Sequence, residues 1–236
     1  MTAEDVQKEL NAIANPEKEK LLQRYFKTGA GGYAEGDKFL GVMVPLQRNI
    51  AKKYRDLNLD EIKKLLSSKI HEYRFTALKI LVLRYGKALE KDKAKIVAFY
   101  LKNKKNINNW DLVDTSAPYI LGNWLINNDR SVLYELVKSK NVWDKRIAVV
   151  STAFFIRNND FKDTLRLAKI LLIDKHDLIH KATGWMLREV GKRSEITLEK
   201  FLGENCQVMP RTMLRYAIER LPKQKQKYYL SAKAKK

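Results

Sequence analysis

The stretch KATGWMLRE, residues 181–189, places a basic residue ahead of a face of small and apolar side chains. The same pattern recurs in RFTALKIL from Arg74, RIAVVSTA from Arg146 and RYAIERL from Arg215, and WDLVDTSA carries Asp111 at the corresponding position. Taken in chain order, these five positions are 37, 35, 35 and 34 residues apart. A helical period of this length is typical of two-helix repeats stacked into a solenoid. The sequence therefore predicts an all-α superhelix of HEAT-like helical repeats, with the second helix of each pair lining the concave face.

Prolines and capping residues indicate further helix starts. Asn15-Pro16 precedes EKEKLLQRYF, Pro45 opens LQRNIAKKYRDL, Asp60-Glu61 opens EIKKLLSSKI, and Met209-Pro210 opens RTMLRYAIERL. In contrast, the segment from Thr28 to Gly41 holds five of the ten glycines, so we expect one long loop there. Long loops in compact domains are usually functional or mobile.

The composition excludes several classes of protein. Of the 236 residues 45% are hydrophobic, enough for a sizeable core, and the 10 glycines and 5 prolines are too few for the many turns of a sheet protein. The one cysteine, Cys206, excludes an internal disulfide and a cysteine-ligated zinc site, and three histidines leave little scope for another metal. No uncharged apolar run approaches the ~18 residues that span a bilayer, and MTAEDVQKEL lacks the features of a signal peptide. We expect a cytoplasmic protein without a cofactor.

The formal net charge of +20 favours a polyanionic partner, nucleic acid before an anionic membrane. The segment KQKQKYYLSAKAKK, from Lys223 onward, holds six lysines and no acid. We therefore expect one domain over residues 1–222 and a basic C-terminal tail over residues 223–236. The remaining charge of about +14 exceeds the ~2–8 charges that solubility needs. We expect the recurring Arg74, Arg146, Lys181 and Arg215 to form a row of positive charge along the concave face, which suits a duplex.

One carboxylate and two indoles are expected on this concave face. Trp110 and Asp114 are four residues apart and so share one face of a helix, while Trp185 and Arg146 lie at the start of, or just inside, other second helices. We therefore expect the four side chains to converge. The chain shows no Ser, His or Cys arrangement for nucleophilic catalysis and no second catalytic carboxylate. The stretch GAGGYAEG lacks the Lys-Ser/Thr of a phosphate-binding loop.

The stretches WDLVD, VWDKR and KATGWMLRE resemble the AlkD family of alkylpurine DNA glycosylases, and RYFKTGAGGYAEGDKFLGVMVP resembles the opening of that family's repeat domain. The resemblance covers about residues 15 to 220. It implies a HEAT-like superhelix that excises N3- and N7-alkylated purines from duplex DNA while the lesion stays stacked. It also implies that Asp114 is the catalytic carboxylate, that Trp110 and Trp185 face the deoxyribose and backbone of the lesion, and that Arg146 binds a phosphate.

Further DNA-binding residues follow from the same comparison and from the recurring helices. Tyr25, in RYF, matches the position of a family tyrosine that faces the DNA. The basic candidates are Arg74, Lys145, Lys181 and Arg188. Two departures from the family stand out: the loop from Thr28 to Asp37 is longer than in the best-known type, and Met43 stands where many relatives have arginine.

One carboxylate is enough for this chemistry because an N3- or N7-alkylated purine already carries positive charge and leaves without a general acid. An oxocarbenium-like cation develops at the sugar, and a fixed anion stabilises it and orients the attacking water. Indole faces attract cations by about 0.5–2 kcal/mol each. No lysine stands out as a Schiff-base nucleophile, so we expect a monofunctional hydrolase, acting as a monomer.

Two other functions stay open on the same fold: a non-catalytic protein that binds DNA structure by charge and shape, and a protein-interaction scaffold. The glycine-rich loop is either a mobile arm that orders on DNA or an inert connection between helices. Several residues are expected to be structural: Trp124 and Trp143 in the core, Cys206 as a small buried residue, and His71, His176 and His180 at the surface or between repeats.

Overall fold

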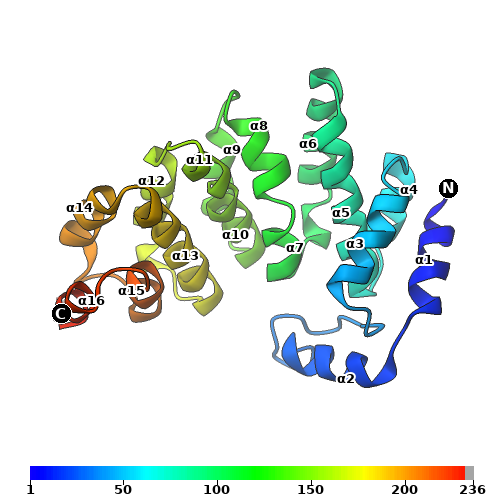
Figure 1. Ribbon diagram of the computed structural model, residues 1–236, viewed down its shortest axis with the longest axis horizontal. Helices are drawn as coiled ribbons and strands as arrows, with labels where there is room; N and C mark the ends of the chain where they lie inside the picture. The colour runs from blue at the N-terminus through cyan, green and yellow to red at the C-terminus, as the bar shows by residue number, and fades with distance from the viewer. Residues whose placement is uncertain (232–236) are drawn as a thin grey trace. The chain divides into compact units, whose positions relative to one another are not determined.

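The computed structural model describes residues 1–231, which form helices joined by turns and loops (Figure 1). Within these residues there is no β-strand, only an isolated bridge between Lys38 and Ile70. The prediction of an all-α helical repeat fold is confirmed. No helix in the described part of the chain is long and apolar enough to cross a membrane.

The chain divides into two compact units, Met1–Ser116 and Ala117–Lys236. The first unit contains a 3-10 turn at Lys104–Asn106 and the helices α1 (Ala3–Ala12), α2 (Pro16–Tyr25), α3 (Val44–Lys53), α4 (Leu59–Leu66), α5 (His71–Lys87), α6 (Glu90–Lys102) and α7 (Trp110–Asp114). The second unit contains a π-helical turn at Pro118–Gly122, a 3-10 turn at Leu171–Ile173 and the helices α8 (Asn123–Leu125), α9 (Ser131–Val137), α10 (Val142–Ser151), α11 (Ala153–Arg157), α12 (Lys162–Ile170), α13 (Asp177–Arg193), α14 (Glu195–Asn205), α15 (Arg211–Ile218) and α16 (Lys223–Ser231). The single domain over residues 1–222 stays a prediction.

Side-chain caps begin two helices of the first unit: α2 at Asn15, as the sequence indicated, and α4 at Asn58, so that α4 starts at Leu59, one residue before the predicted Asp60. Asn15 Oδ1 accepts a hydrogen bond from the backbone N–H of Lys18 at 3.0 Å, and Asn58 Oδ1 accepts one from Glu61 at 2.9 Å. Such caps satisfy N–H groups that have no partner within the helix. The start predicted at Pro45 is confirmed, with α3 beginning one residue earlier at Val44.

Helix α5 is the central element of the first unit, because α1, α3, α4, α6 and α7 all pack against it. Its first eight residues, His71 to Leu78, are all buried, although His71, Glu72 and Arg74 are ionisable. Burying ionisable side chains is costly unless they are paired or hydrogen-bonded. The start of α5 therefore requires polar partners from neighbouring segments.

In the second unit, α13 packs against both α10 and α15 (Figure 1). These three helices carry the recurring stretches that begin at Arg146, Lys181 and Arg215. Each of the three residues is the fifth of its helix, so equivalent positions repeat from one helix to the next. The predicted repeat period is therefore confirmed in this unit.

The small residue of the pattern allows α13 and α15 to approach closely. A Cβ atom on Gly184 would lie 2.5 Å from the carbonyl oxygen of Met213 and 2.6 Å from Tyr216 Cβ. Distances this short do not occur between real atoms of this kind, so glycine is required where the two helices meet.

The other structural expectations hold in part. Trp143 is buried, as predicted, whereas Trp124 is only half-buried on the three-residue helix α8, and Cys206 is also half-buried. The predicted basic tail begins as helix α16, which buries Tyr229 in an apolar cluster that includes Leu221. Residues 232–236 of that tail lie outside the described residues.

Replacing Gly184 with alanine tests the close packing of α13 on α15. Alanine favours a helix over glycine by up to about 1 kcal/mol, but here its Cβ requires the two helices to separate, and such overpacking typically costs about 1–3 kcal/mol. We expect a net loss in the free energy of unfolding, measured with urea. The matched control is Gly203→Ala in α14, where a Cβ meets no heavy atom within 4 Å and stability should hold or rise. Equal effects of the two substitutions would contradict the close approach.

Candidate functional site

Helix α7 carries the sequence WDLVD, and its five residues divide between the core and the surface. Leu112 and Val113 are fully buried, whereas Trp110 and Asp114 are half-buried, one helical turn apart. Asn109 caps the helix, its side-chain oxygen accepting a hydrogen bond from the backbone N–H of Trp110 at 2.8 Å. The prediction that Trp110 and Asp114 share one helix is confirmed, and their functional roles stay predictions.

Trp110 is held by aromatic side chains from the end of α2 and from the glycine-rich loop. Its indole N–H donates a hydrogen bond to the Tyr33 hydroxyl at 3.1 Å, across 77 positions of the sequence. Its ring stacks on Phe26, with centroids 5.3 Å apart, and meets Tyr25 edge-on at 6.1 Å. Phe26 in turn stacks on Phe39 of the loop. The loop therefore forms one side of the candidate site. No local sequence pattern indicates this placement of the loop.

The end of the loop is anchored on the buried carboxylate of Glu72 in α5. This carboxylate accepts hydrogen bonds from the backbone N–H groups of Leu40, Gly41 and Val42 at 3.0, 2.9 and 3.2 Å. Burial raises the pKa of Glu72 in spite of these donors. Gly41 has a φ of 77°, and a Cβ there would lie 2.0 Å from the carbonyl oxygen of Asn15, so only glycine fits. The predicted long loop is confirmed, and it is packed against α5.

Asp37, His71, Arg74 and Asp111 form a buried charge cluster between the loop, α5 and α7. The Asp37 carboxylate accepts a hydrogen bond from Arg74 at 2.6 Å and lies 3.3 Å from His71 Nδ1. The other ring nitrogen, His71 Nε2, lies 2.8 Å from Asp111 Oδ2. His71 is 2% exposed, so of its two predicted places, at the surface or between repeats, the surface is wrong: its ring pairs with two carboxylates inside the unit.

The two carboxylates decide the ionisation of the buried charge cluster. Burial alone lowers the pKa of His71, but Asp111 and Asp37 outweigh it and raise that pKa above its usual value. Burial also opposes ionisation of Asp37, yet the hydrogen bond with His71 and the charge of Arg74 lower the pKa of Asp37. The two carboxylates of the buried charge cluster therefore balance the positive charges of its histidine and its arginine. No group of three or more His, Cys, Asp or Glu side chains in residues 1–231, this cluster included, is arranged to hold a metal ion.

A partly buried cation lies close to the end of α7. Lys79 of α5 donates a hydrogen bond to Thr115 Oγ1 at 3.2 Å, one residue beyond Asp114. Burial lowers the pKa of Lys79, and the charge of Arg48 lowers it further. Burial raises the pKa of the Tyr100 phenol, and the nearby Asp114 carboxylate raises it further. No sequence pattern indicates that Lys79 lies near α7, because it stands among apolar residues within the recurring stretch RFTALKIL.

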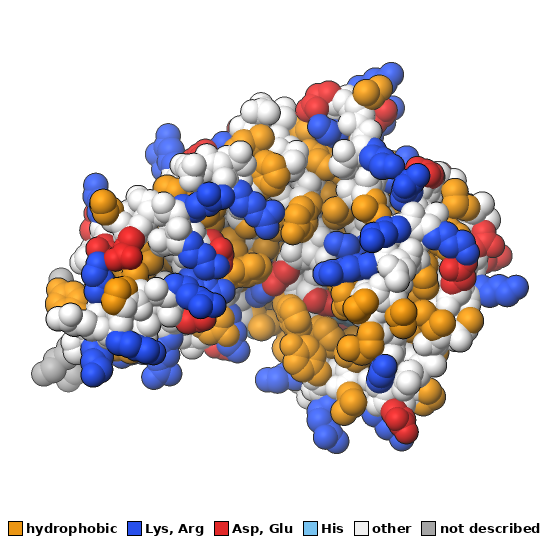
Figure 2. All heavy atoms as spheres, viewed as in Figure 1, with side chains coloured by type: hydrophobic (Ala, Val, Ile, Leu, Met, Phe, Trp, Pro, Cys, Tyr) orange, Lys and Arg blue, Asp and Glu red, His pale blue; other side chains and the backbone are white. Residues whose placement is uncertain are grey.

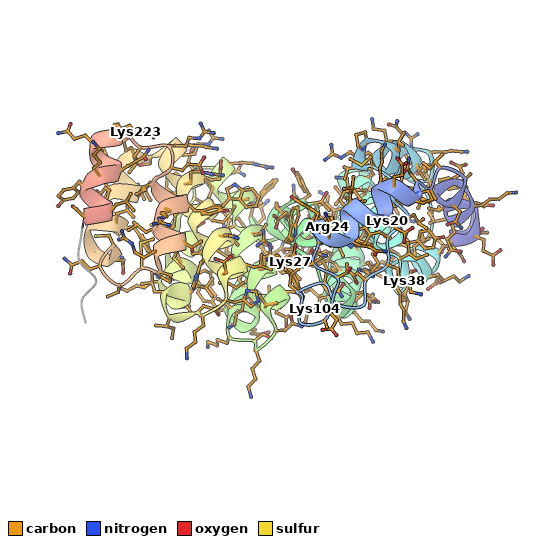
Figure 3. The ribbon with its side chains drawn as sticks, turned by 90° about the horizontal axis from the view of Figure 1, so that it is seen from below. Lys20, Arg24, Lys27, Lys38, Lys104 and Lys223 are labelled. Atoms are coloured by element: carbon orange, nitrogen blue, oxygen red, sulfur yellow. The ribbon has the colours of Figure 1, made fainter. Side chains whose placement is uncertain are left out.

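Helix α2 and the glycine-rich loop also carry exposed cations, and Tyr25 at the end of α2 is 64% exposed. Lys20, Arg24 and Lys27 follow at helical spacing and Lys38 lies on the loop, and all four are exposed on the face drawn in Figure 3. We call these four the α2 basic surface. None of them forms an ion pair with a carboxylate within residues 1–231. Around α2 and the loop, apolar side chains are exposed among basic ones (Figure 2). Exposed aromatic and cationic side chains together are typical of nucleic-acid-binding surfaces.

The second unit holds the other two predicted site residues. Trp185 is half-buried on α13, and its indole N–H donates a hydrogen bond to Glu189 Oε1 at 3.1 Å. Arg146 is 5% exposed on α10 and donates a hydrogen bond to the carbonyl oxygen of Leu178 at 2.9 Å. Their roles toward DNA stay predictions.

The predicted row of positive charge is wrong for two of its four members. Arg74 is 4% exposed and pairs with Asp37, and Arg146 is similarly buried. At these two positions the arginine faces a neighbouring segment: Arg74 bonds to the Asp37 carboxylate and Arg146 to the carbonyl oxygen of Leu178. Arg215 is exposed and Lys181 is half-exposed, as a surface role requires.

Lys181 and the two other basic candidates of the second unit have acidic partners. Lys145, Lys181 and Arg188 form ion pairs with Asp174, Asp177 and Glu219. A carboxylate this close neutralises much of the field of each cation. The α2 basic surface of the first unit therefore offers more unneutralised charge than these three residues do.

Comparison with known proteins gives a family and a structural relative. The model of the DNA alkylation repair enzyme family matches residues 6–221. A solved structure described as a predicted DNA alkylation repair enzyme from Enterococcus faecalis is 18% identical, with a TM-score of 0.71 over 89% of this chain and 97% of that one, which shows a shared fold. No curated protein matches this chain. Because the family model spans nearly the whole sequence, the chain belongs to the DNA alkylation repair enzyme family.

Proposed function

We propose that this protein is a DNA glycosylase that hydrolyses the N-glycosidic bond of positively charged N3- and N7-alkylated purines in duplex DNA. The observation that carries the proposal is helix α7, where a carboxylate and an indole lie one turn apart in a member of the DNA alkylation repair enzyme family. The proposal gives Asp114 the catalytic role and Trp110 the role of an aromatic surface beside it.

The proposed reaction needs an anion more than it needs an acid. An alkylated purine that is already cationic departs as a neutral base, so its leaving group requires no proton. Positive charge then develops on the sugar, in an oxocarbenium-like transition state. The Asp114 carboxylate would stabilise that charge and orient the attacking water, which adds to the sugar carbon and loses a proton.

Trp110 would contribute through its orientation. The ring face of an indole attracts cations by about 0.5–2 kcal/mol. The hydrogen bond to Tyr33 and the stacking on Phe26 hold this indole before any substrate arrives, so little rearrangement is required on binding. Trp185 and Arg146 are proposed to serve the same reaction on the strength of the family resemblance alone.

Removing the charge of Asp114 tests the chemical role. Asp114→Asn keeps the shape of the side chain, and losing one preorganised electrostatic group typically costs about 10²–10³ in rate. We expect single-turnover excision of N7-methylguanine from duplex DNA to slow by that factor, while affinity for the duplex changes little.

A matched control for this substitution is Asp92→Asn, which removes a carboxylate from α6 in the same unit, where it pairs with Lys95. Excision by this variant should match that of the unsubstituted protein. Unchanged excision in Asp114→Asn would refute the assignment. A protein that only binds DNA structure would release no base in either form.

The α2 basic surface is proposed to bind DNA phosphates. Replacing Lys20, Arg24 and Lys27 together by glutamine should weaken duplex binding for all base sequences. It should also reduce the dependence of log affinity on log salt by about 0.9 for each phosphate that the variant no longer neutralises. Fluorescence anisotropy over a salt series measures both quantities.

The control for this triple variant replaces three exposed lysines that already have acidic partners: Lys53 with Glu9, Lys64 with Glu61, and Lys95 with Asp92. The change in net charge is the same in both triple variants. Equal salt slopes for the two would show that only net charge matters and would remove the α2 basic surface from the DNA interface.

A further inference from the structure

His71 joins two segments that are distant in the sequence and that both border the candidate site. Its Nδ1 faces Asp37 on the glycine-rich loop, and its Nε2 faces Asp111 on α7. We propose that His71 is a positioning residue, which fixes helix α7 and the glycine-rich loop relative to each other so that Trp110 and Asp114 keep their places. This inference rests on the proposed glycosylase function.

Helix α7 needs such support because of its length. It has five residues, little more than one turn, and helices this short are not stable by themselves. Leu112 and Val113 anchor its buried side. On the other side, Asp111 lies 2.8 Å from His71 Nε2, and its other oxygen accepts the backbone N–H of Leu112 at 2.8 Å. The Asp111 carboxylate therefore connects the backbone of α7 to α5.

The same imidazole also supports the aromatic side chains that hold Trp110. The His71 ring stacks on Phe39 at 4.6 Å between centroids and lies 5.0 Å from Phe26. Phe26 stacks directly on Trp110. One buried ring thus contacts the loop, the end of α2 and α7, so removing it would loosen two supports of Trp110 together.

The charges around His71 favour its doubly protonated form. The groups that face it are the carboxylates of Asp37 from the loop and Asp111 from α7, and Arg74, whose Nη2 lies 3.5 Å from Nδ1, on its own helix. Glu72, also on α5, is buried beside it. Both ring nitrogens have a carboxylate oxygen as partner, and only the imidazolium has two N–H groups to donate.

This arrangement gives the proposal a pH dependence. The pKa of His71 is raised in the folded protein, so its stabilising contribution is complete below the unfolded value of about 6.5 and is lost as the pH rises through the folded value. Above that pH, one arginine faces two carboxylates and the connection between loop and α7 weakens. Excision should therefore decline on the alkaline side, and His71→Gln should abolish that decline.

The experiment compares His71→Gln, Asp111→Asn and the double variant with Tyr73→Phe as the matched control. Tyr73→Phe removes a side-chain hydrogen bond from the same helix, to Asn11 of α1, without touching the loop or α7. We expect each single variant to slow single-turnover excision of N7-methylguanine by at least about tenfold, because an error of 1 Å in placement can cost about 10² in rate. Duplex affinity should stay within about twofold.

The double variant and the pH profile separate positioning from general damage. If His71 acts through Asp111, the double variant is no slower than the slower single variant, whereas independent effects multiply. The alkaline decline of the unsubstituted protein should be absent in His71→Gln and present in Tyr73→Phe. Multiplying effects, or an unaltered pH profile in His71→Gln, would overturn the proposal.

A readout without catalysis distinguishes this proposal from the proposed function. With fluorotryptophan incorporated, the fluorine NMR signal of Trp110, assigned with Trp110→Phe, should shift or broaden in His71→Gln and in Asp111→Asn. The signals of Trp124, Trp143 and Trp185 should not change, and Tyr73→Phe should leave all four in place. Absence of excision by the unsubstituted protein refutes the glycosylase function alone. An unmoved Trp110 signal in both variants refutes the positioning role.

Discussion

The buried Asp37 carboxylate imposes the constraint on which the arrangement of the first unit depends. An ionised carboxylate away from water is stable only with close opposite charge, and Arg74 and His71 supply it. Because His71 Nε2 also needs a hydrogen-bond partner inside the unit, Asp111 of α7 lies against it. Breaking one member of a buried charge group is far more destabilising than replacing the whole group by apolar residues. The loop, α5 and α7 are therefore constrained together.

The sequence predicts the structural features that depend on residues close to one another in the chain. A recurring position every 34–37 residues, the cap at Asn15 and the spacing of Trp110 and Asp114 all correspond to observed helices. Each depends on backbone periodicity or on a hydrogen bond within a few residues. The contacts that complete the candidate site are of another kind: Trp110 bonds to Tyr33 across 77 positions, and His71 meets Asp111 across 40. No periodicity indicates such partners.

The recurring arginines show why charge alone is an incomplete guide to a binding surface. A basic residue at the same position of successive helices predicts an exposed row, but two of the four residues face an adjacent segment, where Arg74 bonds to a carboxylate and Arg146 to a carbonyl oxygen. Long cationic side chains can serve in the interior when such acceptors are available. Exposed cations without an ion pair within residues 1–231 do lie around α2, at Lys20, Arg24 and Lys27, although no recurring pattern marks these residues in the sequence.

In the proposed reaction, the net charge of +20 and the Asp114 carboxylate act over different ranges. Surface cations attract phosphates, but salt screens their field within about 8–10 Å. In the proposed reaction, the same positive field would oppose the positive charge that develops on the sugar. Two unit charges 4 Å apart interact by about 4 kcal/mol at an effective dielectric constant of 20, against about 1 kcal/mol in water. The interaction energy of about 4 kcal/mol is comparable with the free energy of about 3–4 kcal/mol by which one preorganised group lowers a reaction barrier. Because Asp114 is half-buried, the proposed catalysis would depend more on the placement of Asp114 by α7 than on the number of lysines proposed to bind DNA.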